Sequence, residues 1–185
     1  MDSSDKKLGI VVAAVILIII SGIVLFPYPT DAEKMVIKSA DLKGFKDGFE
    51  WKGWIGGVLT MAGSSGNTSS EVVYWLNANA LNESFIIQEE LTVFNSNEAC
   101  TRYFDDYPPQ NDSMQVGDGS HGWYDNWTYA NFRLAFVRQN VYVWLDVNQF
   151  PSGYSVHDPR TIAYELAQLQ LDKIEQYLAQ HPGAS

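Results

Sequence analysis

The segment from Asp118 to Asp125 holds the side chains of this chain that are best suited to chemistry. Asp118, Ser120, His121 and Asp125 lie close together in a polar stretch. Carboxylates with an imidazole can hold a cation, and a serine near a histidine and a carboxylate can act as a nucleophile. The spacing matches neither an EF-hand loop nor a helical zinc pair, and there is no Gly-x-Ser-x-Gly elbow. We therefore keep Asp118, His121 and Asp125 as a candidate ligand or metal site and expect no catalytic residue.

Cys100 is the only cysteine of the chain, so an intramolecular disulfide and a thiolate metal cluster are excluded. It recurs with apolar residues at helical spacing and has no cation beside it, which favours a core residue over a nucleophile. The neighbouring carboxylates Asp105 and Asp106 are an alternative source of ligands for a hard cation. Phosphate-binding glycine loops are absent from the sequence, and we expect no cofactor.

Two groups of aromatic residues predict a surface for contact with another protein. Trp123, Tyr124 and Trp127 lie in one segment, and Tyr142 and Trp144 alternate along a predicted strand. In that strand the aliphatic residues take the opposite face, so the two aromatic side chains form an apolar surface unless another element packs on them. Exposed apolar surfaces of this kind commonly bind a partner.

An uncharged apolar run from Leu8 to Leu25, centred near Ile16, predicts a membrane-spanning helix. Its 18 residues make a helix about 27 Å long, close to the hydrocarbon thickness of a bilayer. Lys6 and Lys7 precede the run, and Tyr28 between two prolines follows it at the expected interface. We expect the N-terminus in the cytoplasm and the rest of the chain on the extracytoplasmic side of the cell membrane.

The alternative for this run is a cleaved secretory signal. A signal peptide has a shorter apolar run followed by small residues in an Ala-x-Ala pattern, and neither feature is present. An uncleaved signal-anchor is therefore favoured. The predicted organisation is a cytoplasmic tip and anchor over 1–29, a connector over 30–33, one domain over 34–181 and a tail over 182–185.

Glycosylation patterns and charge agree with an extracytoplasmic domain. Four Asn-x-Ser/Thr sequons occur, with acceptors at Asn67, Asn82, Asn111 and Asn126. The net charge is −10, from 12 Lys and Arg against 22 Asp and Glu. An acidic domain is a poor partner for nucleic acid and for anionic lipid surfaces. We expect the bilayer and other membrane or envelope proteins as partners, and no nucleic acid.

The hydrophobic pattern of the domain begins with strands. Short strands are predicted over 34–38, 49–61 and 71–76, with a loop over 63–70. From Phe85 to Val93 apolar and polar residues alternate, except that Glu89 lies on the apolar face. Since unpaired charges are rarely buried, an edge position or a bulge that turns Glu89 outward is favoured over a functional inward carboxylate.

A helix, a hairpin and a second helix follow. Asn95 with Glu98 predicts a capping box for a helix over 95–107, and a polar loop is expected over 110–122. Strands over 131–137 and 141–147 form a hairpin in which Asn140 can take a positive φ. Asp158 caps the last helix, whose apolar stripe includes Gln170, a residue that is expected to be hydrogen-bonded in the core.

This order predicts an α+β domain with an antiparallel sheet covered on one face by two helices. The pattern resembles PsbP/Mog1-like extracytoplasmic domains of bacterial and archaeal lipoproteins. The resemblance is carried by Asp41-Leu42 with Gly44-Phe45, Ala99 and Phe104 in the first helix, Gly117-Asp118, the hairpin from Phe136 to Val143 and the closing amphipathic helix. Its motifs are structural, and in such domains the fold implies no chemistry.

Two functions from different classes follow. The first is a non-catalytic, single-pass surface protein that serves as an accessory subunit or a cell-envelope protein-interaction module. The alternative is a small-ligand or metal-binding domain that uses the segment from Asp118 to Tyr129, with or without hydrolytic activity.

Overall fold

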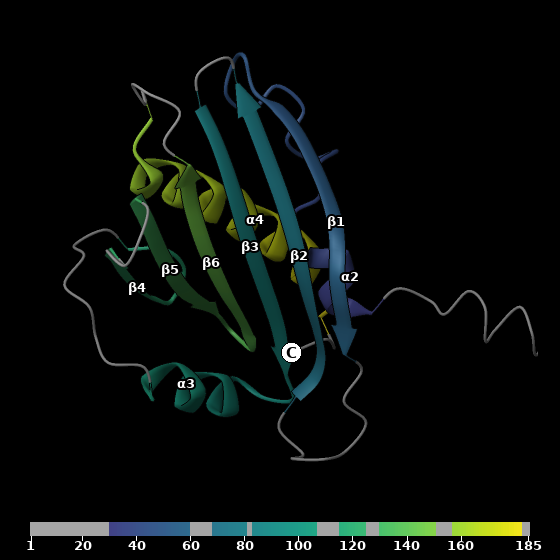
Figure 1. The fold of residues 1–185 in the computed structure, drawn as a ribbon. Coiled ribbons are helices and arrows are strands. Elements are labelled where there is room, and N and C mark those ends of the chain that lie inside the picture. Colours follow the sequence, from purple (N-terminus) through teal and green to yellow (C-terminus); the bar gives the residue numbers. More distant parts are fainter. Residues whose placement is uncertain are drawn as a thin grey trace, which may run out of the picture.

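The computed structural model describes residues 30–59, 68–80, 83–106, 115–124, 130–150 and 157–182. Within these residues it is an α+β protein with three helices and six strands (Figure 1). The elements in chain order are α2 (Asp31–Met35), β1 (Glu50–Leu59), β2 (Thr68–Ala80), β3 (Glu83–Phe94), α3 (Asn97–Asp105), β4 (Gly119–Tyr124), β5 (Ala130–Arg138), β6 (Val141–Phe150) and α4 (Pro159–Gln180).

The six strands form one antiparallel sheet in the order β1-β2-β3-β6-β5-β4. Two three-stranded meanders are therefore joined where β3 pairs with β6. Side chains alternate between the two faces along each strand, as the burial pattern of β2 and β3 shows. The arrangement leaves β1 and β4 as the two edges of the sheet.

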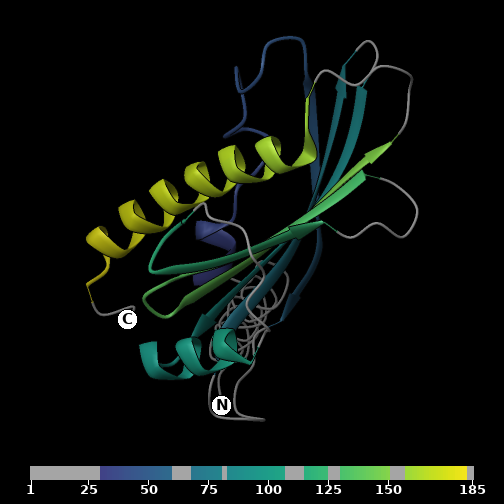
Figure 2. The same cartoon turned by 90° about the vertical axis from the view of Figure 1, so that its left-hand side faces the viewer.

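Helices cover both faces of the sheet, so the prediction of two helices on one face is wrong. Phe136 and Val143 belong to the larger core, beneath α4 and α2. Their neighbours Val137 and Tyr142 point the other way and pack with Cys100 on α3. Figure 2 shows β5 and β6 between α4 and α3. We call these surfaces the α4 face and the α3 face of the sheet.

The strand predicted over 34–38 is wrong, since the short helix α2 includes Lys34 and Met35. Thr30 caps this helix: its Oγ1 accepts a hydrogen bond from Glu33 N, and the Glu33 carboxylate accepts one from Thr30 N. This capping box lies in the segment that was interpreted as a polar connector. The apolar residues that suggested a strand are instead the buried side of one helical turn and the extended segment after it.

Other boundaries differ in smaller ways. Ser96 rather than Asn95 caps α3, and Gln139 rather than Asn140 has the positive φ, 53°, in the β5–β6 turn. Strand β4 lies partly in the predicted polar loop, and β2 begins inside the loop predicted over 63–70. The β5–β6 hairpin and the cap of α4 by Asp158 are confirmed.

The predicted anchor lies outside the described residues, as do Leu8, Ile16, Leu25 and Tyr28. All four sequon asparagines also lie outside them. In the part of the chain that the structure describes, no helix combines the length and the apolar character needed to cross a bilayer.

Candidate functional site

Strand β1 forms the longer free edge of the sheet, and its glycines set its local shape. A Cβ atom at Gly53 would lie 2.6 Å from the ring of Tyr74, and one at Gly56 would lie 2.5 Å from the indole of Trp75. Large aromatic side chains of β2 therefore occupy the space beside the β1 backbone, and a larger residue at either position would displace an aromatic ring. The pairing register shifts between Ile55 and Gly57, which marks a bulge.

The edge exposes apolar side chains on both faces of the sheet. Trp54 is 51% exposed on the α3 face, and Ile55 and Val58 are 46% and 37% exposed on the α4 face. The charges of β1 lie near its start, where Lys52 Nζ is 3.0 Å from a Glu50 carboxylate oxygen. Proteins usually protect long edges with charges, prolines, bulges or short strands. The bulge between Ile55 and Gly57 is one such protection, but the second half of β1 contains no charged residue and no proline.

Beside β1, the α3 face is aromatic and acidic. Trp54 is stacked with its cross-strand partner Trp75, with ring centroids 6.5 Å apart and an interplanar angle of 11°. Glu71 lies opposite Leu59, and Glu90 lies opposite Val73. Burial raises the pKa of Glu90, and the nearby charge of Glu71 raises it further. The two carboxylates therefore repel each other, and among the described residues no cation pairs with either.

Strand β4 forms the other edge, and contacts hold it at both ends. Asp118 accepts hydrogen bonds from Arg138 Nη1 at 2.5 Å and from the backbone of Gln139 at 2.7 Å. Tyr124 OH donates to the Asp158 carboxylate at 2.9 Å, which joins the far end of β4 to the start of α4. This edge is six residues long.

The residues predicted to bind a ligand or metal lie at this β4 edge. Asp118 is held by Arg138, and the ring of His121 is stacked on Phe104, 4.2 Å between centroids. Asp125 lies outside the described residues. A group of three metal-ligating side chains is not found in the described ranges. Since Asp118 already carries two structural hydrogen bonds, its contacts favour a role in holding β4 to the β5–β6 turn.

The predicted aromatic surface is divided. Tyr142 is 1% exposed because α3 covers it, with Tyr103 packed edge-on at 5.0 Å, so Tyr142 is not a surface residue. Trp144 is half-buried against Trp123, 5.2 Å between centroids. Tyr124 is 47% exposed. Trp127 lies outside the described residues. Sequence periodicity gave the correct face for Tyr142 but could not show that a helix covers that face.

Glu89 is a fully buried carboxyl group on the α4 face, and the expectation that it turns outward is wrong. Its Oε1 accepts a long hydrogen bond, 3.4 Å, from the backbone of Ile37, while its Oε2 has no hydrogen-bond partner among the described residues. Burial raises the pKa of Glu89 to about 8, although the Ile37 N–H and the charge of Lys173 oppose the shift. The group is therefore mostly a neutral acid at pH 7.

Helix α4 completes this buried polar cluster. The Gln170 side chain accepts from Ile37 N and donates to Met35 O, each at 2.8 Å, which confirms that it is hydrogen-bonded in the core. Lys173 donates to Val36 O at 2.9 Å and pairs with Asp41. A cavity of about 300 Å³ adjoins the cluster and is lined by Ile37, Asp41, Leu42, Leu169, Asp172, Lys173 and Gln176. The polar groups of the cluster satisfy the backbone that follows α2, which indicates a structural role.

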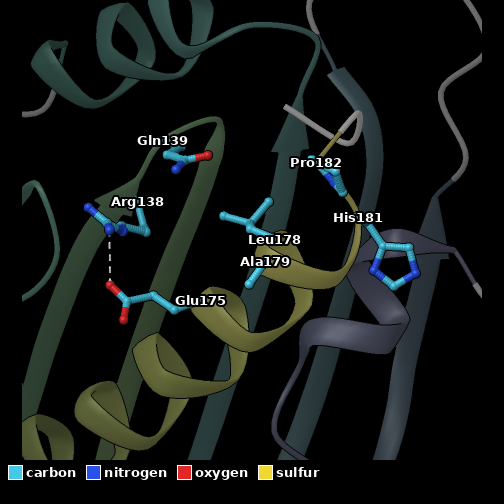
Figure 3. Close-up of a pocket in the computed structure, with 7 residues that line it drawn as sticks. All are labelled: Arg138, Gln139, Glu175, Leu178, Ala179, His181 and Pro182. Carbon is cyan, nitrogen blue, oxygen red and sulfur yellow. Dashed lines mark ion pairs between the residues drawn. The ribbon is translucent and has the colours of Figure 1, made fainter.

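A second cavity, of about 420 Å³, lies between α4 and the β5–β6 turn (Figure 3). Arg138 and Glu175 point toward each other in it, with 3.1 Å between a guanidinium nitrogen and a carboxylate oxygen. The rest of the lining consists of Leu178, Ala179, His181, Pro182 and Gln139. Because Asp118 and Glu175 both pair with Arg138, its charge is balanced and attracts an anionic ligand weakly.

The nucleophile candidates have structural contacts. Cys100 is buried, and burial raises the pKa of its thiol to about 12, with the charge of Asp118 adding to the effect. Ser120 Oγ accepts a hydrogen bond from the backbone of Val116 at 3.1 Å. A thiol that stays protonated is a poor nucleophile, so the core role predicted for Cys100 is consistent with its surroundings.

Sequence reasoning identified β1 but not its importance as an edge. The glycines at 53, 56 and 57 were interpreted as interruptions of the strand, whereas the first two make room for aromatic side chains of β2. Strand order decides which strand is an edge, and order depends on long-range pairing. The combination of Trp54, Ile55 and Val58 with few charges was the one local signal that could have suggested an exposed binding edge.

Comparison with known proteins gives one structural similarity. No family model and no curated protein matches this chain. A solved structure that resembles it is the extracellular domain of PknH from Mycobacterium tuberculosis, with a TM-score of 0.46 and 10% sequence identity, covering 80% of this chain and 98% of that chain. That neighbour is an extracytoplasmic bacterial domain, while the resemblance to PsbP/Mog1-like domains stays a prediction. At this level of similarity no functional residue is transferred.

Proposed function

We propose that this chain is a membrane-anchored, extracytoplasmic protein-interaction module without catalytic activity, and that β1 is its docking edge. In this proposal the apolar run from Leu8 to Leu25 is the anchor, and the described domain lies outside the cell membrane. The partner is a membrane or envelope protein rather than nucleic acid, in keeping with the net charge of −10.

The single observation that carries the proposal is the contrast between length and protection at β1. Ten residues of edge strand present backbone groups on the side away from β2, with exposed Trp54, Ile55 and Val58 beside them. A segment that adds as a seventh strand would gain main-chain hydrogen bonds and cover these side chains. Cys100 and Glu89 are instead buried in the core, and Asp118 is held by Arg138.

Site-specific photocross-linking in intact cells tests this proposal. A photoreactive residue in place of Ile55 is expected to capture a defined partner band, while the same residue in place of Tyr124 on the β4 edge captures much less. Both positions are comparably exposed, at 46% and 47%, so accessibility is matched. A cross-linker at Trp54 then monitors the effect of Ile55→Lys and Val58→Lys. Both changes should reduce capture of the partner, because charges on an edge oppose strand addition. Equal capture from both edges, or capture that survives both lysines, would refute the docking edge.

Location needs its own experiment. External protease added to intact cells is expected to digest the domain, because the proposal places it outside the membrane. A domain that is cleaved only after lysis would contradict the proposed location, although it would leave the docking edge itself untouched.

A further inference from the structure

The α3 face of β1 has a gap beside Trp54. Gly57 faces this side, opposite Val73, and the position where its side chain would lie is open: apart from its chain neighbours, no described residue has an atom within 4 Å of a Cβ placed there. Trp54 borders the gap on one side, and Trp75 lies over Gly56 next to it. The surface at Gly57 is therefore open backbone, and the stacked rings of Trp54 and Trp75 lie at the neighbouring pair.

Two carboxylates, on β2 and β3, lie on the same face of the sheet as this open position. Glu71 lies one pair from Val73 on the same face of β2, and Glu90 is the partner of Val73 on β3. A strand added beyond β1 would lie two strand spacings from β2, about 10 Å. An extended lysine or arginine side chain and the side chain of Glu71 together close that distance. Glu90 lies one strand further and adds negative potential.

We propose that the segment which docks on β1 carries a lysine or arginine, whose charged end lies over Gly57 between the ring of Trp54 and the carboxylate of Glu71. This inference rests on the proposed function and names the chemistry of its partner. The cation would be attracted by the aromatic ring and by the carboxylate, and the added backbone would be fixed by hydrogen bonds to the β1 edge.

Charge favours such a segment over a second copy of this chain. Antiparallel pairing of two β1 edges would extend one sheet, with the α3 faces of both copies on the same side. The Glu71 and Glu90 pairs of two copies, each with a net charge of −10, would then lie near one another and repel. A basic segment has the opposite effect, because it neutralises the pair.

Peptide binding to the full chain in a mild detergent tests the inference. The probes are capped peptides of sequence Thr-Val-Thr-X-Thr-Val-Thr in which X is Lys, Gln or Glu, together with a Lys peptide methylated on alternate backbone nitrogens. We expect the Lys peptide to bind about tenfold more tightly than the Gln peptide, and the Glu peptide to bind most weakly. The preference should shrink as salt rises, and methylation should abolish binding.

Variants of the protein locate the site. Glu71→Gln should remove most of the preference for the Lys peptide over the Gln peptide, while affinity for the Gln peptide stays the same. Glu98→Gln on the exposed surface of α3 removes the same charge elsewhere and should leave the preference intact. Trp54→Ala should weaken both peptides, and the Lys peptide more.

The outcomes separate this inference from the proposed function. Equal binding of Lys and Gln peptides, or a preference that Glu71→Gln leaves undiminished, overturns the cation site and leaves edge docking standing. Loss of all peptide binding, together with equal photocross-linking from both edges, overturns both. A stable dimer that Ile55→Lys dissociates makes a second copy the occupant and overturns the basic segment.

Discussion

The two edges of the sheet differ in length, charge and attachment. β4 is short and is fixed at its ends by the hydrogen bonds of Asp118 and Tyr124. β1 is longer, packs on Phe45 and Phe49 at its start through Trp51, and exposes apolar side chains along its second half. Both edges end the hydrogen-bonding ladder, yet among the described residues side-chain contacts hold both ends only for β4. The comparison shows that β4 is attached to its own domain at both ends, and under the proposed function β1 is the edge that remains for a partner.

A pair of glycines gives the largest expected contrast between the edges. Gly117, just before β4, has a φ of +64°, and a Cβ there would lie 2.3 Å from the Val137 carbonyl oxygen. Gly117→Val should destabilise the domain by about 3 kcal/mol, because it adds backbone strain to a steric clash. Gly57→Ala in β1 meets open space and should change stability by less than about 0.5 kcal/mol. Denaturant unfolding of both variants measures the difference, and similar losses would contradict it.

The buried carboxyl of Glu89 allows stability to be changed without altering either edge. Its pKa is raised from 4.5 to about 8 in the folded state, so the folded state binds the proton more tightly than the unfolded state. Its contribution to stability is therefore present in full below the unfolded pKa and is lost as pH rises toward about 8. The expected slope is about 1.4 kcal/mol per pH unit between those values.

Glu89→Gln keeps the shape of the side chain and removes the ionisable carboxyl group. We expect this variant to lose the slope and to be more stable than the wild type at pH 8, while peptide binding at β1 is unchanged. Unfolding in denaturant at pH 5, 6, 7 and 8 gives the slope directly. If the free energy of unfolding of the wild type stays constant or rises between pH 5 and pH 8, Glu89 is ionised in the folded state. Asp172→Asn, an exposed change on α4, is the control.

Asp118 tests the attachment of β4 and gives a smaller effect. Asp118→Ala removes the acceptor for Arg138 and for the backbone of Gln139, and it should cost about 1 kcal/mol because both contacts are exposed. Hydrogen exchange should rise in β4 and in the β5–β6 turn and stay unchanged in β1. An unchanged exchange rate in β4 would mean that its pairing with β5 alone fixes that edge.

Local patterns predicted much of this fold, because they depend on nearby residues. The β5–β6 hairpin, the Asp158 cap and the interior position of Gln170 all follow from alternation, helix-start signals and helical periodicity. The features that failed depend on distant contacts. Glu89 is accommodated because Ile37, 52 residues away, donates to it, and Tyr142 is covered because α3 crosses that face. The candidate site was missed for the same reason, since strand order makes β1 an edge.

Trp54 also gives a small expected effect, and it is the sharpest test of the comparison. Trp54→Ala removes the most exposed of the large apolar side chains described on the protein, and about half of that side chain is already in solvent. Its loss should therefore cost less than about 1 kcal/mol of stability, mostly the stacking with Trp75. Tyr124→Ala, an exposed aromatic on the other edge, should cost more than its size suggests, because its hydroxyl group holds the cap of α4. If Trp54→Ala proves the more destabilising of the two, β1 is a structural edge, and its aromatic side chain is retained for folding rather than for a partner.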